Sequence, residues 1–485
     1  MLRSLLLEYQ RPSGVNSHMH LKYFFSTLHI LIASIFLTAC QSSDFGQITS
    51  APSSLLSMVK DAKFASEDSE ATTNNQVSAP LGDILEGSLD YKNQGSDFLT
   101  TLKYALDTDP NIISSRRDIE AKLAVVKSNK AQKDFQVGTT LYGGIEDVTD
   151  NTKGAAISVD VSKLVFDGGK LDSQVASTVF AVEAAKMNLL ASIDARAFEL
   201  CQIWLELDKY RTLQEQIDKR LAVLEPLIEQ LEQVAKAGVG DVSKVTAAQR
   251  TVSAIRVEQT NISESLAQAE LEFSNAYGML SNDINFDYNF ISGLVPEKID
   301  DRLVQSAPML LSQYANYQAD MARVRSLEAK RGFDVGFEVR AMRPFAGSGR
   351  DSDESVGLVG RKTLFNGGLL ESEIQEAEAL VEARAAQIKA TYRKGSRTVQ
   401  TAVQNIRSMD KAILLARENS KLTADEIIYL RQQLIIGGST LDSVLSAEAR
   451  LYEAESKEIN FLTEKYKSQL IVVTSLGLLS KSMGF

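Results

Sequence analysis

The side chains that most often carry enzyme chemistry are few in this sequence and lie near its beginning. All three histidines, His18, His20 and His29, precede residue 30, and the two cysteines are Cys40 and Cys201. Cleavage of an export signal that ends before Cys40, as argued below, removes every histidine. A Cys/His nucleophile pair, a Ser/His/Asp triad and a histidine-containing metal site are then excluded. We therefore expect no catalytic residue, no cofactor and no metal ion in the remaining chain.

Cys40 is the residue whose surroundings point most clearly to a covalent modification. It ends the sequence Leu37-Thr38-Ala39-Cys40, which closes an apolar run of 14 residues from Phe24 to Leu37. Such a run is typical of an export signal and is shorter than the roughly 20 residues of a membrane-spanning helix. The ending resembles the bacterial lipobox, which implies that Cys40 receives a diacylglycerol and becomes the new N-terminus. The alternative is an ordinary signal peptide with a chance cysteine.

Residues next to the cysteine indicate the membrane to which the protein is sent and the start of its signal sequence. Gln41 follows the cysteine, where an aspartate would hold many lipoproteins at the inner membrane, so the resemblance implies the outer membrane of a Gram-negative cell. Met19 begins a conventional signal sequence by itself, and we expect residues 1–18 to precede the true translation start. Residues 41–95 are rich in Ser, Asp, Asn and Thr and are expected to form a flexible tether.

The net charge of the chain argues against nucleic acid as a binding partner. Without residues 1–40 the chain has 49 basic and 62 acidic side chains, a net charge of −13. So acidic a chain is a poor candidate for nucleic-acid binding. Paired carboxylates could in principle serve an envelope hydrolase, but no short motif frames such a pair, and a solvated helix face accounts better for most Asp and Glu residues.

An internal duplication organises the chain. Phe166-Asp167-Gly168-Gly169 recurs as Phe365-Asn366-Gly367-Gly368, 199 residues later, and Phe135-Gln136-Val137-Gly138 recurs in part at Phe333–Gly336, 198 residues later. We therefore expect a first repeat at 96–285, a linker at 286–299 and a second repeat at 300–482.

Each repeat changes its hydrophobic period twice. Residues 134–142 with 154–166, and 333–342 with 355–365, alternate in polarity and predict two β-hairpins. Each Gly-Gly pair is followed by nearly 70 residues with no glycine in the first copy and only Gly395 in the second. A helix of that length is on the order of 100 Å long. Pro226 lies inside the first of these helices and is expected to kink or break it.

Seven-residue spacing predicts that the long helices form coiled-coil hairpins with the helices that follow. In the first copy the spacing links Ile203, Tyr210, Ile217, Leu224 and Leu231, and the return series includes Val245, Val252, Leu266 and Phe273. In the second copy it links Leu415, Leu422, Tyr429 and Ile436, and the return series is Leu445, Tyr452, Ile459 and Tyr466. We expect all of these residues, together with Trp204 and Cys201, to be core.

This order of elements resembles the TolC family of outer-membrane efflux proteins over nearly the whole chain, from Asp97 to Leu479. The resemblance implies a mainly α protein with a membrane β-barrel portion. Four strands per protomer would close a 12-stranded barrel in a homotrimer above a periplasmic helical tunnel. An oligomer is also expected from the four strands alone, because an open sheet edge has no hydrogen-bond partner in lipid.

The resemblance further identifies two groups of candidate residues. The strand-to-helix junction of the barrel comprises Phe166, Gly168, Gly169, Phe365, Gly367 and Gly368. The periplasmic tip or gate comprises Gly238, Gly240, Asp241, Lys244, Gly437, Gly438, Asp442 and Ser443. The tip departs from the family pattern because Lys244 and Ser443 stand where an aspartate usually precedes the valine. Asp241 and Asp442 could form charged rings at a gate or simply stabilise helix N-termini.

The function implied by the resemblance is an exit channel that works with a periplasmic adaptor and an inner-membrane ABC or proton-driven transporter. Drugs or metabolites and a type I secreted protein are both possible cargoes. A lipid-anchored coiled-coil scaffold in the periplasm is the alternative, and it leaves the two β-hairpins unexplained.

Overall fold

The computed structural model describes residues 84, 93, 95, 97–147, 152–237, 242–280, 285–346, 352–436 and 438–485. The chain divides into two units, residues 1–86 and 87–485, and every element described below lies in the second. Cys40 and nearly all of the expected tether lie outside the described residues.

The same order of elements occurs twice. The first set is α5 (Pro110–Ala131), β1 (Gln136–Asp147), β2 (Thr152–Phe166), α6 (Lys170–Lys236) and α7 (Val242–Tyr277). The second is α10 (Pro308–Ala329), β3 (Asp334–Ala346), β4 (Asp353–Arg361), α11 (Leu369–Ile435) and α12 (Leu441–Ser475). Short helices accompany them: α4 (Phe98–Asp107), α8 (Tyr288–Leu294), α9 (Asp301–Gln305) and α13 (Leu478–Ser482). The segment 286–299, expected to link the two repeats, contains the helix α8.

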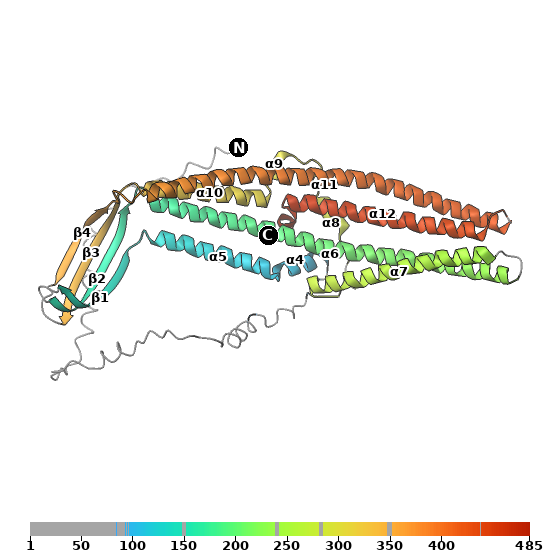
Figure 1. Ribbon diagram of the computed structural model, residues 1–485, viewed down its shortest axis with the longest axis horizontal. Helices are drawn as coiled ribbons and strands as arrows, with labels where there is room; N and C mark the ends of the chain where they lie inside the picture. The colour runs from blue at the N-terminus through green and yellow to red at the C-terminus, as the bar shows by residue number, and fades with distance from the viewer. Residues whose placement is uncertain are drawn as a thin grey trace, which may run out of the picture. The chain divides into compact units, whose positions relative to one another are not determined.

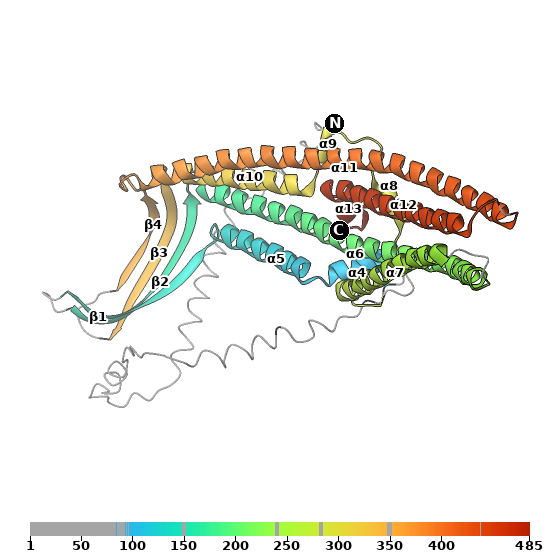
Figure 2. The same ribbon diagram turned by 45° about the vertical axis from the view of Figure 1, so that its right-hand side comes forward.

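The two long helices, α6 and α11, have 67 residues each, as the scarcity of glycine predicts. Of the kink or break expected at Pro226, the break does not occur, since α6 continues through this residue. Figures 1 and 2 show the sheet at one end of α6 and α11, with the ends that lead to α7 and α12 at the other. No described helix combines the length and the apolar character that crossing a membrane requires.

The four strands form one antiparallel sheet in the order β1-β2-β3-β4. The two predicted hairpins are therefore confirmed, and β2 pairs with β3 to join the repeats. In the second hairpin β3 runs further than predicted, to Ala346, whereas β4 ends at Arg361 and not at residue 365. Arg361 pairs with Asp334, the first residue of β3, so the residues after it have no strand beside them.

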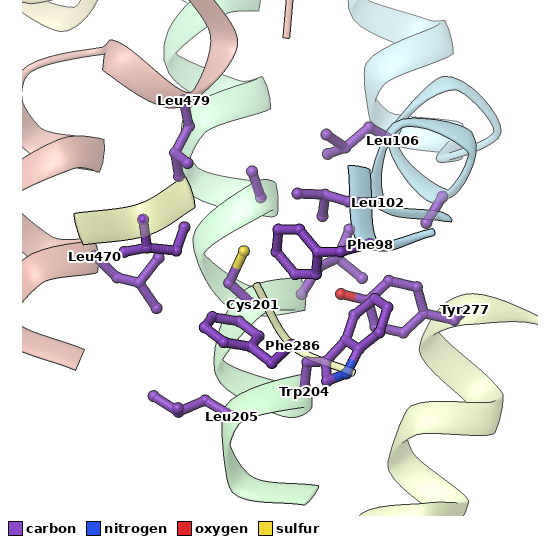
Figure 3. Packing of buried hydrophobic residues seen from close by; sticks show 14 of the residues in the cluster. Phe98, Leu102, Leu106, Cys201, Trp204, Leu205, Tyr277, Phe286, Leu470 and Leu479 are labelled. Atoms are coloured by element: carbon purple, nitrogen blue, oxygen red, sulfur yellow. The ribbon is translucent and has the colours of Figure 1, made fainter. Parts of the chain in front are cut away.

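The main core surrounds the middle of α6. Trp204 and Cys201 are almost fully buried there, as predicted. Figure 3 shows both side chains among the aromatic residues Phe98, Tyr277 and Phe286. The ring centroids of Trp204 lie 5.0 Å from those of both Phe98 and Tyr277. These contacts join α4, α6, α7 and the segment before α8 into one packed region.

The predicted coiled-coil seam is confirmed for α6 and α7, where Ile217, Leu224 and Val252 are buried in one cluster. The prediction is wrong for α11. Its column Leu415, Leu422, Tyr429 and Ile436 is 61% to 81% exposed. A second column, which includes Ile413, Ala416, Thr423 and Ile427, is buried instead. The helix thus carries two apolar columns, and the protomer covers only one.

Candidate membrane sheet and helical tip

The sheet presents a face of exposed apolar side chains. The strand register aligns Val137, Val161, Val339 and Val356 in one row across all four strands. Six apolar side chains on this face are 43% to 71% exposed: Val137, Leu141, Ile157, Val159, Val356 and Leu358. So many exposed apolar residues on one sheet are typical of an interaction with lipid or protein.

The opposite face is polar because side chains alternate along each strand. Asp160 of β2 lies directly across from Arg340 of β3, whose Nε donates to Asp160 Oδ1 at 2.6 Å. On the same face Arg361 of β4 pairs with Glu338, with Nη2 3.0 Å from Oε2. The sheet therefore has one polar, charged face and one mainly apolar face, on which Arg343 and Glu354 form an exposed ion pair.

Both outer strands of the described sheet have an unpaired edge. β1 pairs only with β2, and β4 pairs only with β3. Every second backbone N–H and C=O along these edges lacks a partner within the sheet. In hydrocarbon such groups must be satisfied by another strand, which makes closure with further copies of the sheet a physical requirement in a membrane.

Four phenylalanines mark the end of the sheet that joins the helices. Phe135 precedes β1, Phe166 ends β2, Phe333 precedes β3 and Phe365 follows β4, and the four are 50% to 86% exposed. The ammonium groups of Lys163 and Lys362 lie 4.7 Å and 5.1 Å from the ring centroids of Phe135 and Phe333. Exposed aromatic rings next to cationic side chains are typical of the boundary between lipid and water.

The predicted site included Phe166 and Phe365 but missed Phe135 and Phe333. The repeated Phe-x-Val-Gly sequence at 135–138 and 333–336 was the signal for the missing pair. This sequence places a phenylalanine at the start of each hairpin, whereas Phe166 and Phe365 lie at the ends of the hairpins.

The glycine pairs turn the chain from the sheet into the long helices. Gly168 and Gly169 have φ of +65° and +85°, and Gly367 and Gly368 have +70° and +85°. Two successive left-handed residues favour glycine at both positions. Asp167 supports the first turn, because its carboxylate accepts from the backbone N–H of Gly169 at 3.0 Å and of Leu171 at 2.7 Å.

The structure describes the tip only in part. Gly238, Gly240, Asp241 and Gly437 lie outside the described residues, and of Lys244 only the backbone, in α7, is described. Gly438 precedes α12, and Asp442 and Ser443 lie in its first turn, half-buried.

The N-cap of α12 is Thr440, whose hydroxyl accepts from the backbone N–H of Ser443 at 3.3 Å. The capping role considered for Asp442 thus belongs to Thr440. Asp442 lies two residues into the helix, where a negative charge interacts favourably with the helix dipole.

A buried charge cluster joins the two helical hairpins. Glu448 of α12 is 2% exposed and pairs with Arg220 of α6 and, at 2.7 Å, with Arg431 of α11. A second carboxylate of α12, Glu455, lies 2.8 Å from Arg220. Three helices from both repeats thus meet at one pair of arginines.

A second buried carboxylate, Asp194 of α6, binds the helix α13. It accepts hydrogen bonds from the backbone N–H and the hydroxyl of Ser480, both at 2.8 Å. Burial raises the pKa of Asp194 to about 6, and the hydrogen bonds from Ser480 oppose part of that rise. Both buried carboxylates are satisfied by fixed donors of the protein. Among the described residues, no three His, Cys, Asp or Glu side chains gather as a metal site would require.

Solved bacterial membrane proteins share this fold. The outer membrane protein VceC of Vibrio cholerae matches 78% of this chain and 95% of its own, with 16% identity and a TM-score of 0.67. CusC, described as forming a transmembrane channel, matches 80% and 95%, with 14% identity and a TM-score of 0.69. The CmeC outer membrane channel of Campylobacter jejuni matches 90% and 94%, with 11% identity and a TM-score of 0.66.

Neither a protein-family model nor a curated protein matches the sequence. The agreement therefore concerns the fold, over 78% to 90% of this chain. The chain has the fold of the TolC-type outer-membrane channels, as the sequence resemblance predicts for its helices and its antiparallel sheet.

Proposed function

We propose that this protein is the outer-membrane exit channel of a tripartite export system. The observation that carries the proposal is the sheet, which combines an exposed apolar face, a charged face and two unpaired edges at the end of helices 67 residues long. A periplasmic scaffold has no use for such a sheet. The shared fold with VceC, CusC and CmeC supports the same function.

The working form is a homotrimer, in which four strands per copy give a barrel of twelve. The two unpaired edges of the sheet, β1 and β4, support a head-to-tail arrangement, in which β4 of one copy pairs with β1 of the next. In the half of the helical layer that lies away from the sheet, α11 packs on α12, α12 on α6, and α6 on α7, so that α11 and α7 lie outermost there (Figure 1). The exposed column of α11 provides apolar surface at one of these edges. Head-to-tail contacts generate a closed ring when the rotation between copies closes.

Location in the outer membrane and the partners follow from the same proposal. The barrel spans the outer membrane, and Cys40 adds a lipid anchor. A periplasmic adaptor and an inner-membrane ABC or proton-driven transporter deliver cargo, either small molecules or a secreted protein. Radioactive palmitate should label the wild-type protein and not the Cys40→Ser variant. Persistent labelling of the variant would rule out this anchor.

At the tip, Asp442 is proposed to form a ring of three carboxylates in the trimer. Such a ring favours cations and repels anions. Because Thr440 already caps α12, Asp442→Asn should raise conductance or weaken cation selectivity and change stability by no more than about 1 kcal/mol. Unchanged conductance and selectivity would leave the helix dipole as the whole role of Asp442.

The central test is electrical. Purified protein in a planar bilayer should produce discrete conductance steps, and cross-linking in detergent should yield a species of three chains. A protein that stays monomeric in membranes and forms no conducting pore would overturn the proposal. The Cys40→Ser variant is a useful second sample, since pore formation by the barrel requires no lipid anchor.

A further inference from the structure

Four charged side chains of alternating sign form two ion pairs on the polar face of the sheet. Their order is Arg361 of β4, Glu338 and Arg340 of β3, and Asp160 of β2. Arg361 reaches both carboxylate oxygens of Glu338, and Arg340 donates to Asp160 at 2.6 Å. The hydroxyl of Ser158 holds the other oxygen of Asp160 at 3.0 Å. We name Asp160, Glu338, Arg340 and Arg361 the charge belt.

The charge belt is balanced in number but not in access to solvent. The side chains of Arg340 and Arg361 are 59% and 66% exposed, whereas those of Asp160 and Glu338 are 34% and 30% exposed. In each pair the guanidinium group is therefore the more exposed partner, and the carboxylate that it binds orients it. A solute that passes over this face meets the guanidinium groups first, with their charge offset by the carboxylates that they bind.

The register decides which way the belt faces in a closed barrel. Asp160 and Arg340 alternate with Val159, Val161 and Val339, which belong to the exposed apolar face. In a membrane that apolar face must contact lipid, so the charge belt lines the lumen. Around a ring of three copies, each of its four charges occurs three times.

We infer that the charge belt determines the ion selectivity of the barrel and, through its internal pairing, keeps that selectivity weak. This inference rests on the proposed channel function and adds a filter at the membrane, separate from the tip. Rings of unpaired charge select ions strongly by sign. Close pairing replaces each full charge by a dipole, whose field falls off faster with distance. The belt therefore admits cargo of either charge.

Single neutral substitutions test the pairing because each one leaves a ring of three uncompensated charges. In a planar bilayer with a KCl gradient, Arg340→Gln should raise the ratio of cation to anion permeability roughly twofold or more, because Asp160 is left unpaired. Asp160→Asn should lower this ratio, because Arg340 is left unpaired. The double variant Asp160→Asn/Arg340→Gln should return the ratio to the wild-type value. Exchange of the two charges, Asp160→Arg/Arg340→Asp, keeps the pairing and should also resemble the wild type.

The sheet offers a matched control on its other face. Arg343 of β3 pairs with Glu354 of β4, and the register places both with Ala341 and Ile157 on the apolar face. Arg343→Gln and Glu354→Gln remove one basic and one acidic charge from the same sheet. They should leave the permeability ratio unchanged, because this pair lies outside the lumen.

The possible outcomes separate the inference from the function on which it rests. Conducting trimers whose ratio is unaffected by the belt variants would overturn the inference and leave the channel intact. A permeability ratio that changes in the Arg343 and Glu354 variants but not in the charge-belt variants would also overturn the inference. It would mean that the apolar face of the sheet, and not the charge belt, lines the lumen. Absence of any pore in the wild-type protein would remove the proposed function and the inference together. If Arg340→Gln or Asp160→Asn fails to assemble, the second ion pair of the belt gives the same test. Arg361→Gln should raise the ratio of cation to anion permeability, and Glu338→Gln should lower it.

Discussion

At the scale of single residues, Asp194 gives the helical part of the molecule a specific dependence on pH. Its pKa is about 6 in the folded chain and roughly 3.9 in an unfolded chain. The folded state therefore binds the proton more tightly. The contribution of Asp194 to the free energy of unfolding falls, by on the order of 3 kcal/mol, as the pH rises from about 4 to about 6. Below and above this window it is constant.

Asp194→Asn should abolish this contribution, because an amide does not titrate and its oxygen still accepts from the backbone N–H of Ser480. At about pH 7.5 the variant should resist urea better than the wild type, and at about pH 4 the difference should be small. The fluorescence of Trp204, the single tryptophan of the chain, reports on unfolding of the surrounding core. A wild-type protein that matches the variant at both values would contradict the prediction.

Glu448 tests the joint between the two helical hairpins. Removing it leaves Arg220, whose side chain is largely buried, and Arg431 without their shared partner. Leaving a buried charge without any partner typically costs about 3–5 kcal/mol, and because Arg220 keeps Glu455 as a partner, Glu448→Ala should lower the free energy of unfolding by no more than that amount.

The matched control is Glu453→Gln on the same helix. The Glu453–Lys457 pair is exposed at both ends, and such pairs contribute about 1 kcal/mol or less. Denaturation curves that shift equally for Glu448→Ala and Glu453→Gln would show that the buried cluster has no special role.

At the scale of elements, the junction between sheet and helices should lie at the membrane surface. We propose to replace Trp204 by Phe and then Phe365 by Trp, which places one fluorophore among the four exposed phenylalanines. In vesicles its emission should be quenched by brominated lipids, because interfacial aromatic side chains lie at the level of the lipid headgroups. A tryptophan at Leu422, far along α11, should escape quenching. Equal quenching at the two positions would exclude this location for the junction.

The same elements show how far the sequence predicts the structure. The glycine-free stretches and the alternating segments predict α6, α11 and both hairpins, because helix length and strand alternation are local properties. The seven-residue spacing of Leu415 and Leu422 was assigned to the wrong surface, since α11 has two apolar columns and only tertiary packing decides which one meets α12. The end of β4 at Arg361 likewise depends on where its partner strand begins.

The candidate site was predicted less completely than the fold. The glycine turns at Gly168 and Gly367 follow from their sequence, because consecutive glycines favour left-handed backbone. The charge belt has no sequence motif: Asp160 and Arg340 are 180 residues apart and meet only through the pairing of β2 with β3. The capping role of Thr440 was missed because Asp442, two residues later, is an equally common cap type.

At the scale of the whole molecule, the exposed apolar column of α11 indicates where neighbouring copies meet in the assembly. In a monomer, Leu422 and Tyr429 are 61% and 65% exposed at the seven-residue spacing of a coiled coil. Apolar residues at this spacing are stable in water when another helix covers them. A neighbouring copy covers these residues if its α7 packs against α11 of the first copy. The same direction of assembly pairs β4 of one copy with β1 of the next.

Leu422→Asp together with Tyr429→Asp should therefore prevent formation of the trimer, because charges buried between helices are strongly unfavourable. The control is Ser446→Asp on α12, which introduces the same charge at an exposed position of a helix that lies inside the layer. Size-exclusion chromatography with light scattering in detergent should give three chains for the wild type and the control. It should give monomers, with helix content retained by circular dichroism, for the double variant. A double variant that remains fully trimeric would show that α11 faces solvent in the assembly and that the copies meet through the sheet alone.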